Sequence, residues 1–78
     1  MSLVAASTVD VLDMLCAQAI MVVWRACRSL AAEAVLEVVC NAHDVQDDLL
    51  IWAKELGHAV LEVEDRSPDT WLRIRKGP

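Results

Sequence analysis

The chain has 78 residues, of which 56% are hydrophobic, with only two glycines and two prolines. This composition excludes a disordered chain and predicts one compact domain over residues 1–78, whose core is too small to enclose a deep catalytic cleft. Twelve acidic residues against seven basic ones give a net charge of −5, and no lysine or arginine cluster is long enough to follow a phosphate backbone. We therefore expect no direct contact with nucleic acid.

The apolar segments are too short for a membrane protein. The longest, residues 14–24, is interrupted by Gln18 and is far below the ~20 apolar residues that a spanning helix needs. Residues 1–7 lack the basic region of a secretory signal, and an odd count of three cysteines suits a reducing compartment better than a disulfide framework. These features predict a cytoplasmic protein.

The first half of the chain predicts a strand, a helix and a second strand. Residues 7–12 are short and β-branched, which favours a strand. Residues 17–32 carry apolar side chains at helical spacing, with Arg25 and Arg28 on the other side, which indicates an amphipathic helix. The valine-rich segment 35–40 is too short for a packed helix and predicts a strand with Leu36, Val38 and Cys40 on one face.

The second half predicts a helix followed by a hairpin. Asn41 or Asp44 can cap the helix, and Asp47 and Asp48 suit the positive end of its dipole before Gly57 ends it. Its expected buried stripe is Val45, Leu49, Trp52 and Leu56. Residues 59–64 and 70–75 alternate between apolar and polar side chains, and the connector 65–69 predicts that they pair as a hairpin.

The resulting order, β-α-β-α-β-β, defines the fold class as α+β. Two helices can cover only one face of a four-stranded sheet, so we expect a two-layer α/β sandwich whose other face is open. Charged residues on that open face can pair across strands, and four apolar residues would leave a patch beside them. The charged set is Glu37, Glu62, Glu64, Arg73 and Arg75, and the apolar set is Val35, Val39, Val60 and Trp71.

Short motifs distributed over residues 9–76 follow one known pattern without a gap. They are Val9-Asp10, Cys16-Ala17-Gln18-Ala19, Ala32-Glu33-Ala34, Asn41-Ala42-His43, Gly57-His58 and Ile74-Arg75-Lys76. In this pattern the chain resembles the TusA or SirA-like sulfur-carrier family, whose first helix starts with Cys-Pro-x-Pro. Four prolines of the family pattern are replaced here, by Ala17, Ala19, Ala32 and His43, whereas the cysteine is retained as Cys16.

The resemblance implies a mixed four-stranded sheet with both helices on one side and a sulfur-transfer role centred on Cys16. In the family this cysteine receives a sulfane sulfur as a persulfide and passes it to an acceptor protein, in tRNA thiolation or sulfur metabolism. The implied donors are proteins such as a cysteine desulfurase, a rhodanese or a DsrE-like protein. No metal or organic cofactor is required, and the protein would be an enzyme only in the sense of a sulfurtransferase.

The position of Cys16 gives this role a physical basis. Its sulfur is expected close to the free N–H groups of the helix that begins near Ala17, where an anion is stabilised and the pKa of a thiol can fall toward neutrality. Alanines at 17 and 19 restore backbone N–H groups that could bond the sulfur, whereas Asp10 and Asp13 oppose a thiolate. The competing interpretation is that Cys16 is one more small apolar residue among its neighbours.

The remaining cysteines and histidines favour structural interpretations. Cys27 and Cys40 fall on the predicted apolar stripes, which indicates core positions. Cys40 and His43 have a C-x-x-H spacing, but the other candidate zinc ligands are scattered, so a metal site is not predicted. His58 either satisfies backbone groups at a helix end or contacts a partner.

The alternative function is a TusA-like interaction or regulatory module that has lost sulfur transfer, an interpretation favoured by the missing prolines. In that case the open sheet face would bind another chain or form a homodimer. Trp71, flanked by Val35, Val39 and Val60, would be the centre of the contact.

Overall fold

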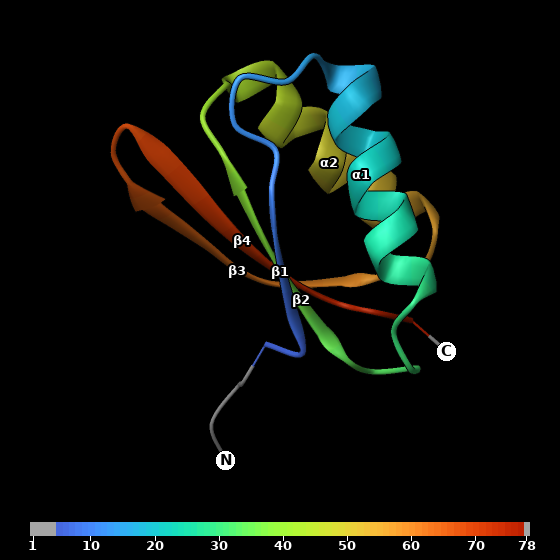
Figure 1. The fold of residues 1–78 in the computed structure, drawn as a ribbon. Helices are drawn as coiled ribbons and strands as arrows, with labels where there is room; N and C mark the ends of the chain where they lie inside the picture. The colour runs from blue at the N-terminus through green and yellow to red at the C-terminus, as the bar shows by residue number, and fades with distance from the viewer. Residues whose placement is uncertain (1–4, 78) are drawn as a thin grey trace.

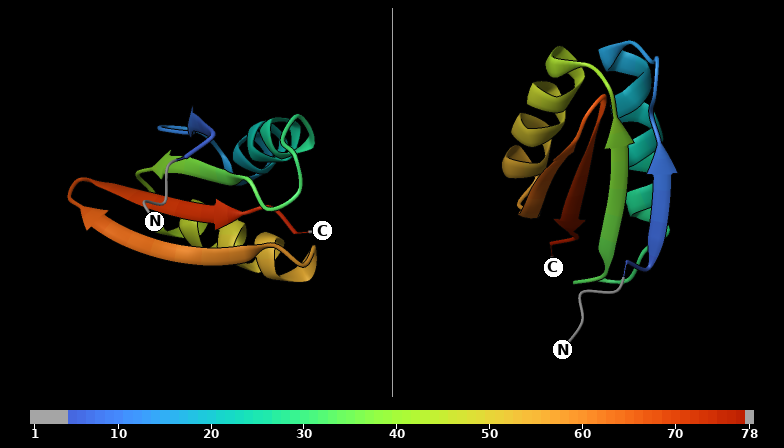
Figure 2. Two further views of the ribbon diagram at one scale, coloured as in Figure 1. Left: turned by 90° about the horizontal axis from the view of Figure 1, so that it is seen from below. Right: turned by 90° about the vertical axis from the view of Figure 1, so that its left-hand side faces the viewer.

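The computed structural model describes residues 5–77, and the fold is a two-layer sandwich (Figure 1). Its elements are β1 (Ser7–Asp10), α1 (Cys16–Arg28), β2 (Val35–Cys40), α2 (His43–Glu55), β3 (Ala59–Arg66) and β4 (Asp69–Arg75). The sheet order is β1-β2-β4-β3, in which β1 and β2 are parallel and the other neighbours antiparallel. Both helices cover the same face of this mixed sheet (Figure 2), which confirms the predicted fold class and element order.

The structure bears on only one of the two predictions about a secretory signal and a membrane-spanning helix. Residues 1–4, part of the stretch without a secretory signal, lie outside the described residues. Among the described residues, neither 13-residue helix has the length and apolar character that crossing a membrane requires.

The first strand and the first helix are both shorter than predicted. β1 ends at Asp10 because the Asp10 carboxylate accepts a hydrogen bond from the Leu12 N–H at 2.7 Å, which turns the chain. α1 begins at Cys16, one residue earlier than predicted, and ends at Arg28. There the N–H groups of Ser29 and Leu30 bond the carbonyls of Ala26 and Cys27, so the last turn closes tightly.

The predicted cap of α2 is wrong. Its N-cap is Ala42, which has no side-chain hydrogen bond, while Asn41 bonds Asp13 and Asp44 lies inside the helix. The expected stripe is confirmed at Val45 and Leu49, which are buried.

At its C-terminal end, α2 departs from the predicted stripe. Trp52 is half-buried, and Leu56, the C-cap residue, is 53% exposed. The buried residue in this turn is Ala53, which the predicted stripe did not include. Gly57 ends the helix as predicted, with a φ of 78° that favours glycine.

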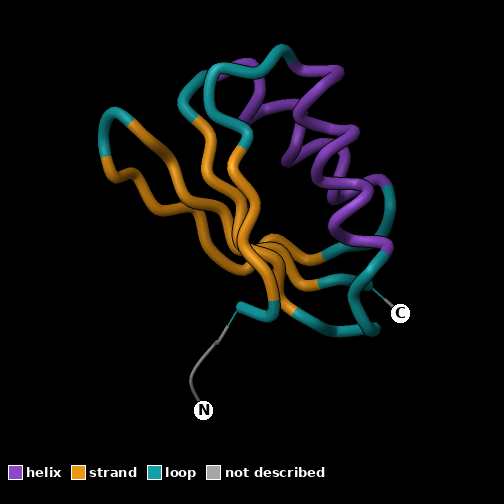
Figure 3. The backbone as a smooth tube through the Cα atoms, in the orientation of Figure 1, coloured by secondary structure: helices purple, strands orange, loops and turns teal. Residues whose placement is uncertain are grey.

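The β3–β4 hairpin is longer than the alternating segments indicate. Pairing continues through Asp65 opposite Thr70 and Arg66 opposite Asp69, which leaves only Ser67 and Pro68 in the turn. In the tube drawing this hairpin extends beyond the rest of the sheet (Figure 3).

The open face carries a polar row across all four strands. Thr8, Glu37, Arg73 and Glu62 lie opposite one another in the ladders. The Arg73 guanidinium donates to Glu37 at 3.2 Å and to Glu62 at 2.9 Å, and the Thr8 hydroxyl donates to Glu37 at 3.3 Å. This confirms the predicted pairing of Arg73.

The apolar patch predicted around Trp71 is smaller than expected. Trp71 lies between Val39 and Glu64, and the Arg66 guanidinium covers its ring at 4.5 Å from the centroid, held there by two hydrogen bonds to Glu64. The placement of Val60 on this face is wrong. A register shift between Val60 and Glu62 puts Val60 opposite Ile74, on the face that the helices cover.

The core lies between the sheet and the two helices. Val11, Ala19, Val23, Leu36, Val38, Cys40, Val45, Leu49, Ala53, Leu72 and Ile74 form its buried cluster. Cys27 is also buried at the edge of this layer, so both Cys27 and Cys40 occupy the core positions predicted for them.

Truncation of one core residue of α2 should cost much more stability than truncation of an exposed residue of the same helix. Leu49→Ala removes a fully buried side chain and is expected to lower the free energy of unfolding by about 2–5 kcal/mol. Ile51→Ala, at a position that is 56% exposed, is the matched control and should change it by less than about 0.5 kcal/mol. Urea denaturation followed by circular dichroism measures both, and equal losses would contradict the assigned core.

Candidate functional site

Cys16 is the first residue of α1 and is half-buried at the edge of the core. The loop before it is held by two reciprocal hydrogen bonds of 2.9 Å, from the Asp13 N–H to the Asn41 amide oxygen and from the Asn41 amide nitrogen to the Asp13 carboxylate. This pair ties the β1–α1 loop to the end of β2. The sulfur atom therefore belongs to a fixed helix start, as predicted.

The N–H groups around Cys16 are already used in part by the helix itself. The Leu15 N–H donates to the Gln18 side-chain oxygen at 3.1 Å, and the Ala19 N–H donates to the Leu15 carbonyl at 2.9 Å. A proline at position 19 could not make the second bond. The N–H that alanine restores at this position thus closes the first turn of α1 and is not available to the sulfur.

The electrostatic environment of Cys16 is the reverse of the expected one. The pKa of its thiol is raised from 9.0 to about 11, first by a hydrogen bond to Asp48, then by desolvation, and then by the negative charges of Asp44 and Asp48. At pH 7 the thiolate is therefore only about one part in ten thousand of the Cys16 population. Two carboxylates outweigh the partial positive charge of the α1 N-terminus.

The carboxylates responsible are not those that the sequence indicated. Asp10 and Asp13, which precede Cys16 in the chain, bond the Leu12 N–H and the Asn41 amide. Asp44 and Asp48 lie one turn apart on α2, and they reach Cys16 because the first turns of α2 lie beside the start of α1. Aspartates in the first turns of a helix are also expected simply because they suit the helix dipole. The sequence alone therefore does not indicate that Asp44 and Asp48 face Cys16; the packing of the two helices does.

His58 has a structural role at the other end of the helix layer. Its Nδ1 accepts the Gly77 N–H at 2.9 Å, and its Nε2 lies 3.8 Å from the sulfur of Cys27. Because Nδ1 accepts, the neutral ring carries its proton on Nε2. His58 therefore connects the chain end after β4 to α1, which supports the structural interpretation of this residue.

The described cysteines and histidines do not gather into one centre. Cys27 and Cys40 are buried, and desolvation is the main cause that raises the pKa of each thiol. Within residues 5–77, no three side chains of histidine, cysteine, aspartate or glutamate come together in an arrangement that could hold a metal ion.

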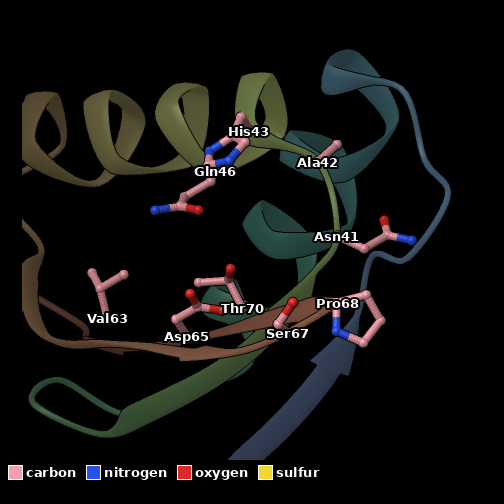
Figure 4. Close-up of a pocket in the computed structure, with 9 residues that line it drawn as sticks. All are labelled: Asn41, Ala42, His43, Gln46, Val63, Asp65, Ser67, Pro68 and Thr70. Atoms are coloured by element: carbon pink, nitrogen blue, oxygen red, sulfur yellow. The ribbon is translucent and has the colours of Figure 1, made fainter.

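A polar cavity of about 270 Å³ lies between the start of α2 and the β3–β4 hairpin. In Figure 4, His43 and Gln46 point from α2 toward Asp65, Ser67 and Thr70 of the hairpin. Cys16 does not line this cavity. The full lining is Asn41, Ala42, His43, Gln46, Val63, Asp65, Ser67, Pro68 and Thr70.

Comparison with known proteins identifies the family. The model of the family described as Sulfurtransferase TusA matches residues 7–76, which include all six elements of the fold. The chain belongs to this family, and the resemblance seen in its motifs is confirmed. No curated protein matches the chain. Membership implies a sulfur-carrier role of the sulfurtransferase type and contacts with other proteins in sulfur relay.

Removal of the Asp48 charge should make Cys16 more reactive at neutral pH. Asp48→Asn is expected to move the pKa of Cys16 from about 11 toward 9.0, and the alkylation rate at neutral pH should rise about tenfold for each unit of that fall. The measurement is the pH profile of iodoacetamide labelling, with mass spectrometry to locate the label. Asp47→Asn, one residue away and exposed, is the matched control. Identical profiles for the two variants would show that Asp48 does not govern the thiol.

Folding stability should fall as the pH drops through the titration range of His58. Its pKa is lowered in the folded state by desolvation and by Lys76, so between that pKa and the ordinary 6.5 the unfolded chain binds more protons. Stability is therefore fully present above about 6.5 and declines below it. Protonation of Nδ1 also removes the acceptor of the Gly77 N–H.

Urea denaturation between pH 5 and pH 8, measured with and without His58, isolates this contribution. In His58→Gln the decline near pH 6.5 should become smaller, whereas in His43→Gln, a control at an exposed position, it should stay as in the parent chain. The assignment to His58 is wrong if the two variants lose the decline equally.

Proposed function

We propose that this protein is a sulfur carrier that accepts a sulfane sulfur as a persulfide on Cys16 and passes it to an acceptor protein. The observation that carries the proposal is the position of Cys16 at the start of α1, within the segment that matches the TusA family. Of the three cysteines it is the one that is not buried, since Cys27 is 3% exposed and Cys40 is fully buried. A sulfur that must pass between proteins has to be reached by both.

The proposed step is a thiol exchange that needs no external oxidant or reductant. The Cys16 thiolate attacks the outer sulfur of a donor persulfide, R–S–SH. A bond forms between the two sulfur atoms, the S–S bond of the donor breaks, and the donor leaves as the thiolate R–S⁻. Cys16 then carries the persulfide Cys16–S–SH, and the same exchange with the thiolate of an acceptor releases that sulfur.

Because the pKa of Cys16 is raised, this step depends on docking of the donor. The free thiol is protonated at neutral pH because Asp44 and Asp48 face it. A donor that brings a lysine or arginine next to these carboxylates offsets their charge and lowers the pKa of the thiol. Sulfur acceptance is then faster from a docked protein than from a small donor in solution.

The resemblance to the family supports a proposal for the donor, the acceptor and the compartment. The donor is a protein such as a cysteine desulfurase, a rhodanese or a DsrE-like protein, and the acceptor belongs to tRNA thiolation or sulfur metabolism. The place of action is the cytoplasm, in keeping with the three free cysteines. No metal or organic cofactor takes part in the exchange.

The second candidate is an interaction module of the same family that no longer transfers sulfur. The observation that favours it is the pKa of about 11 at Cys16, which leaves little thiolate in the isolated protein. Replacement of the signature prolines by Ala17 and Ala19 agrees with it.

Intact-mass measurement after incubation with a cysteine desulfurase and cysteine should show a gain of one sulfur atom. The gain should disappear in Cys16→Ser and persist in Cys27→Ala and Cys40→Ala, which keep the Cys16 thiol. Inorganic polysulfide is the comparison donor, because it needs no docking. An unmodified mass with both donors would favour the interaction module.

A further inference from the structure

The outward surface of α1 and α2 carries several exposed apolar side chains. We call this surface, which points away from the sheet, the helix face. Of the large apolar side chains that are exposed among the described residues, Leu15, Met21, Trp24, Ile51 and Leu56 lie on the helices or at their caps. The Arg28 guanidinium lies over the Trp24 ring, 4.7 Å from its centroid, much as Arg66 lies over Trp71 on the sheet face. The sheet face is distinguished by the ion pairs of Arg73, which cross it.

A groove between the two helices concentrates this apolar surface. Its lining is Ala17, Ile20, Met21 and Trp24 of α1 together with Trp52 of α2. Ala17 directly follows Cys16, so the groove begins next to the thiol. Apolar side chains gathered in one groove make this surface a candidate for contact with another chain.

Charges of opposite sign stand at the two ends of the helix face. Both helices begin at the same end of the molecule and run side by side (Figure 1). Asp44, Asp47 and Asp48 occupy the beginning of α2. At the other end, Arg25 and Arg28 lie in the last turn of α1 and Lys54 in the last turn of α2. Glu55 is the one acidic residue in these two last turns. The helix face is therefore acidic at one end and basic at the other.

We propose that a second copy of this chain covers the helix face in a two-fold symmetric dimer whose helices run antiparallel to those of the first copy. A two-fold axis that lies in the contact plane and runs perpendicular to the helices turns the face over and reverses its direction, so the acidic end of each copy meets the basic end of the other. The contact occurs twice by symmetry, and the two grooves face each other.

Charge complementarity selects a second copy over other occupants. A uniformly basic partner would be attracted by Asp44 and Asp47 but repelled by Arg25 and Arg28 at the other end, and a uniformly acidic partner would meet the reverse. A second copy, turned by the two-fold axis, satisfies both ends. A standard interface buries about 800 Å² on each partner, roughly one sixth of the 4865 Å² surface of the chain.

The dimer has a consequence for Cys16 that does not depend on sulfur transfer. Because the groove begins at Ala17, the partner copy limits access to the neighbouring thiol. Alkylation of Cys16 should therefore become slower, at fixed reagent concentration, as the protein concentration rises.

Sedimentation equilibrium over protein concentrations of about 1 μM to about 1 mM tests the proposal directly. The expected result is a reversible dimer that weakens when the salt concentration is raised from about 0.05 M to about 0.5 M. Met21→Glu, at an exposed groove position, should raise the dissociation constant at least tenfold with an unchanged circular dichroism spectrum. Trp71→Glu on the sheet face is the control and should leave the dimer intact.

A pair of charge-reversed variants tests whether the charges at the two ends of the helix face hold the dimer together. Asp44→Lys/Asp47→Lys places like charges at both contacts of its own dimer, and so does Arg25→Glu/Arg28→Glu, so each should be monomeric alone. Mixed in equal amounts, the two variants regain complementary charges at both contacts and should form a mixed dimer.

Three results would overturn the proposal. The first is a parent chain that stays monomeric at about 1 mM, which would leave the helix face to a different partner. The second is a dimer that Trp71→Glu abolishes and Met21→Glu does not, which would assign association to the sheet face. The third is a pair of folded charge-reversed variants that fail to associate when mixed.

Discussion

The lateral packing of α2 against α1 is the constraint on which both the core and the chemistry of Cys16 depend. Both helices lie on one face of the sheet and pack side by side, and the apolar stripe of each is buried between the helix layer and the sheet. Their parallel course brings two helix N-termini to the same end of the molecule. The acidic first turns of α2, which suit its own dipole, then face the thiol at the start of α1.

The start of α1 accommodates alanine in place of the family prolines without a change of fold. With alanine at position 19, the N–H of this residue bonds the Leu15 carbonyl, and Gln18 takes up the N–H of Leu15. The first turn is complete as a helix, and because its backbone bond uses the N–H of Ala19, this group adds no donor for an anion. The start of α1 therefore combines a retained cysteine with two opposing carboxylates.

Local patterns predicted the elements well, and tertiary contacts account for the errors. β2 was predicted with the observed bounds because a short valine-rich run has few alternatives. The α2 cap was predicted incorrectly because Asn41 bonds Asp13, which is 28 residues away in the sequence. Val60 was assigned to the wrong face because a strand irregularity shifts the alternation.

The sequence predicted the position of Cys16 but not the electrostatic environment of its thiol. The motif around Cys16 placed the thiol at a helix start, and the structure has it there. The direction of its pKa shift depends on Asp44 and Asp48, which follow Cys16 by 28 and 32 residues and reach it only through helix packing. The polar cavity beside α2 was not predictable either, because its lining comes from the start of α2 and from the β3–β4 hairpin, which are separated in the sequence.

The two broad faces of the molecule differ in whether their charges are paired within the chain. This difference bears on whether self-association and sulfur transfer would use the same surface. On the sheet face, Arg73 is held between Glu37 and Glu62, so its charges are compensated within the chain. On the helix face, acidic and basic residues stand at opposite ends of an apolar groove that begins beside Cys16. Any chain that covers this groove also limits access to the thiol. Self-association and docking of a sulfur donor would therefore compete for one surface, and the concentration of the protein itself would set how much Cys16 is open to a donor.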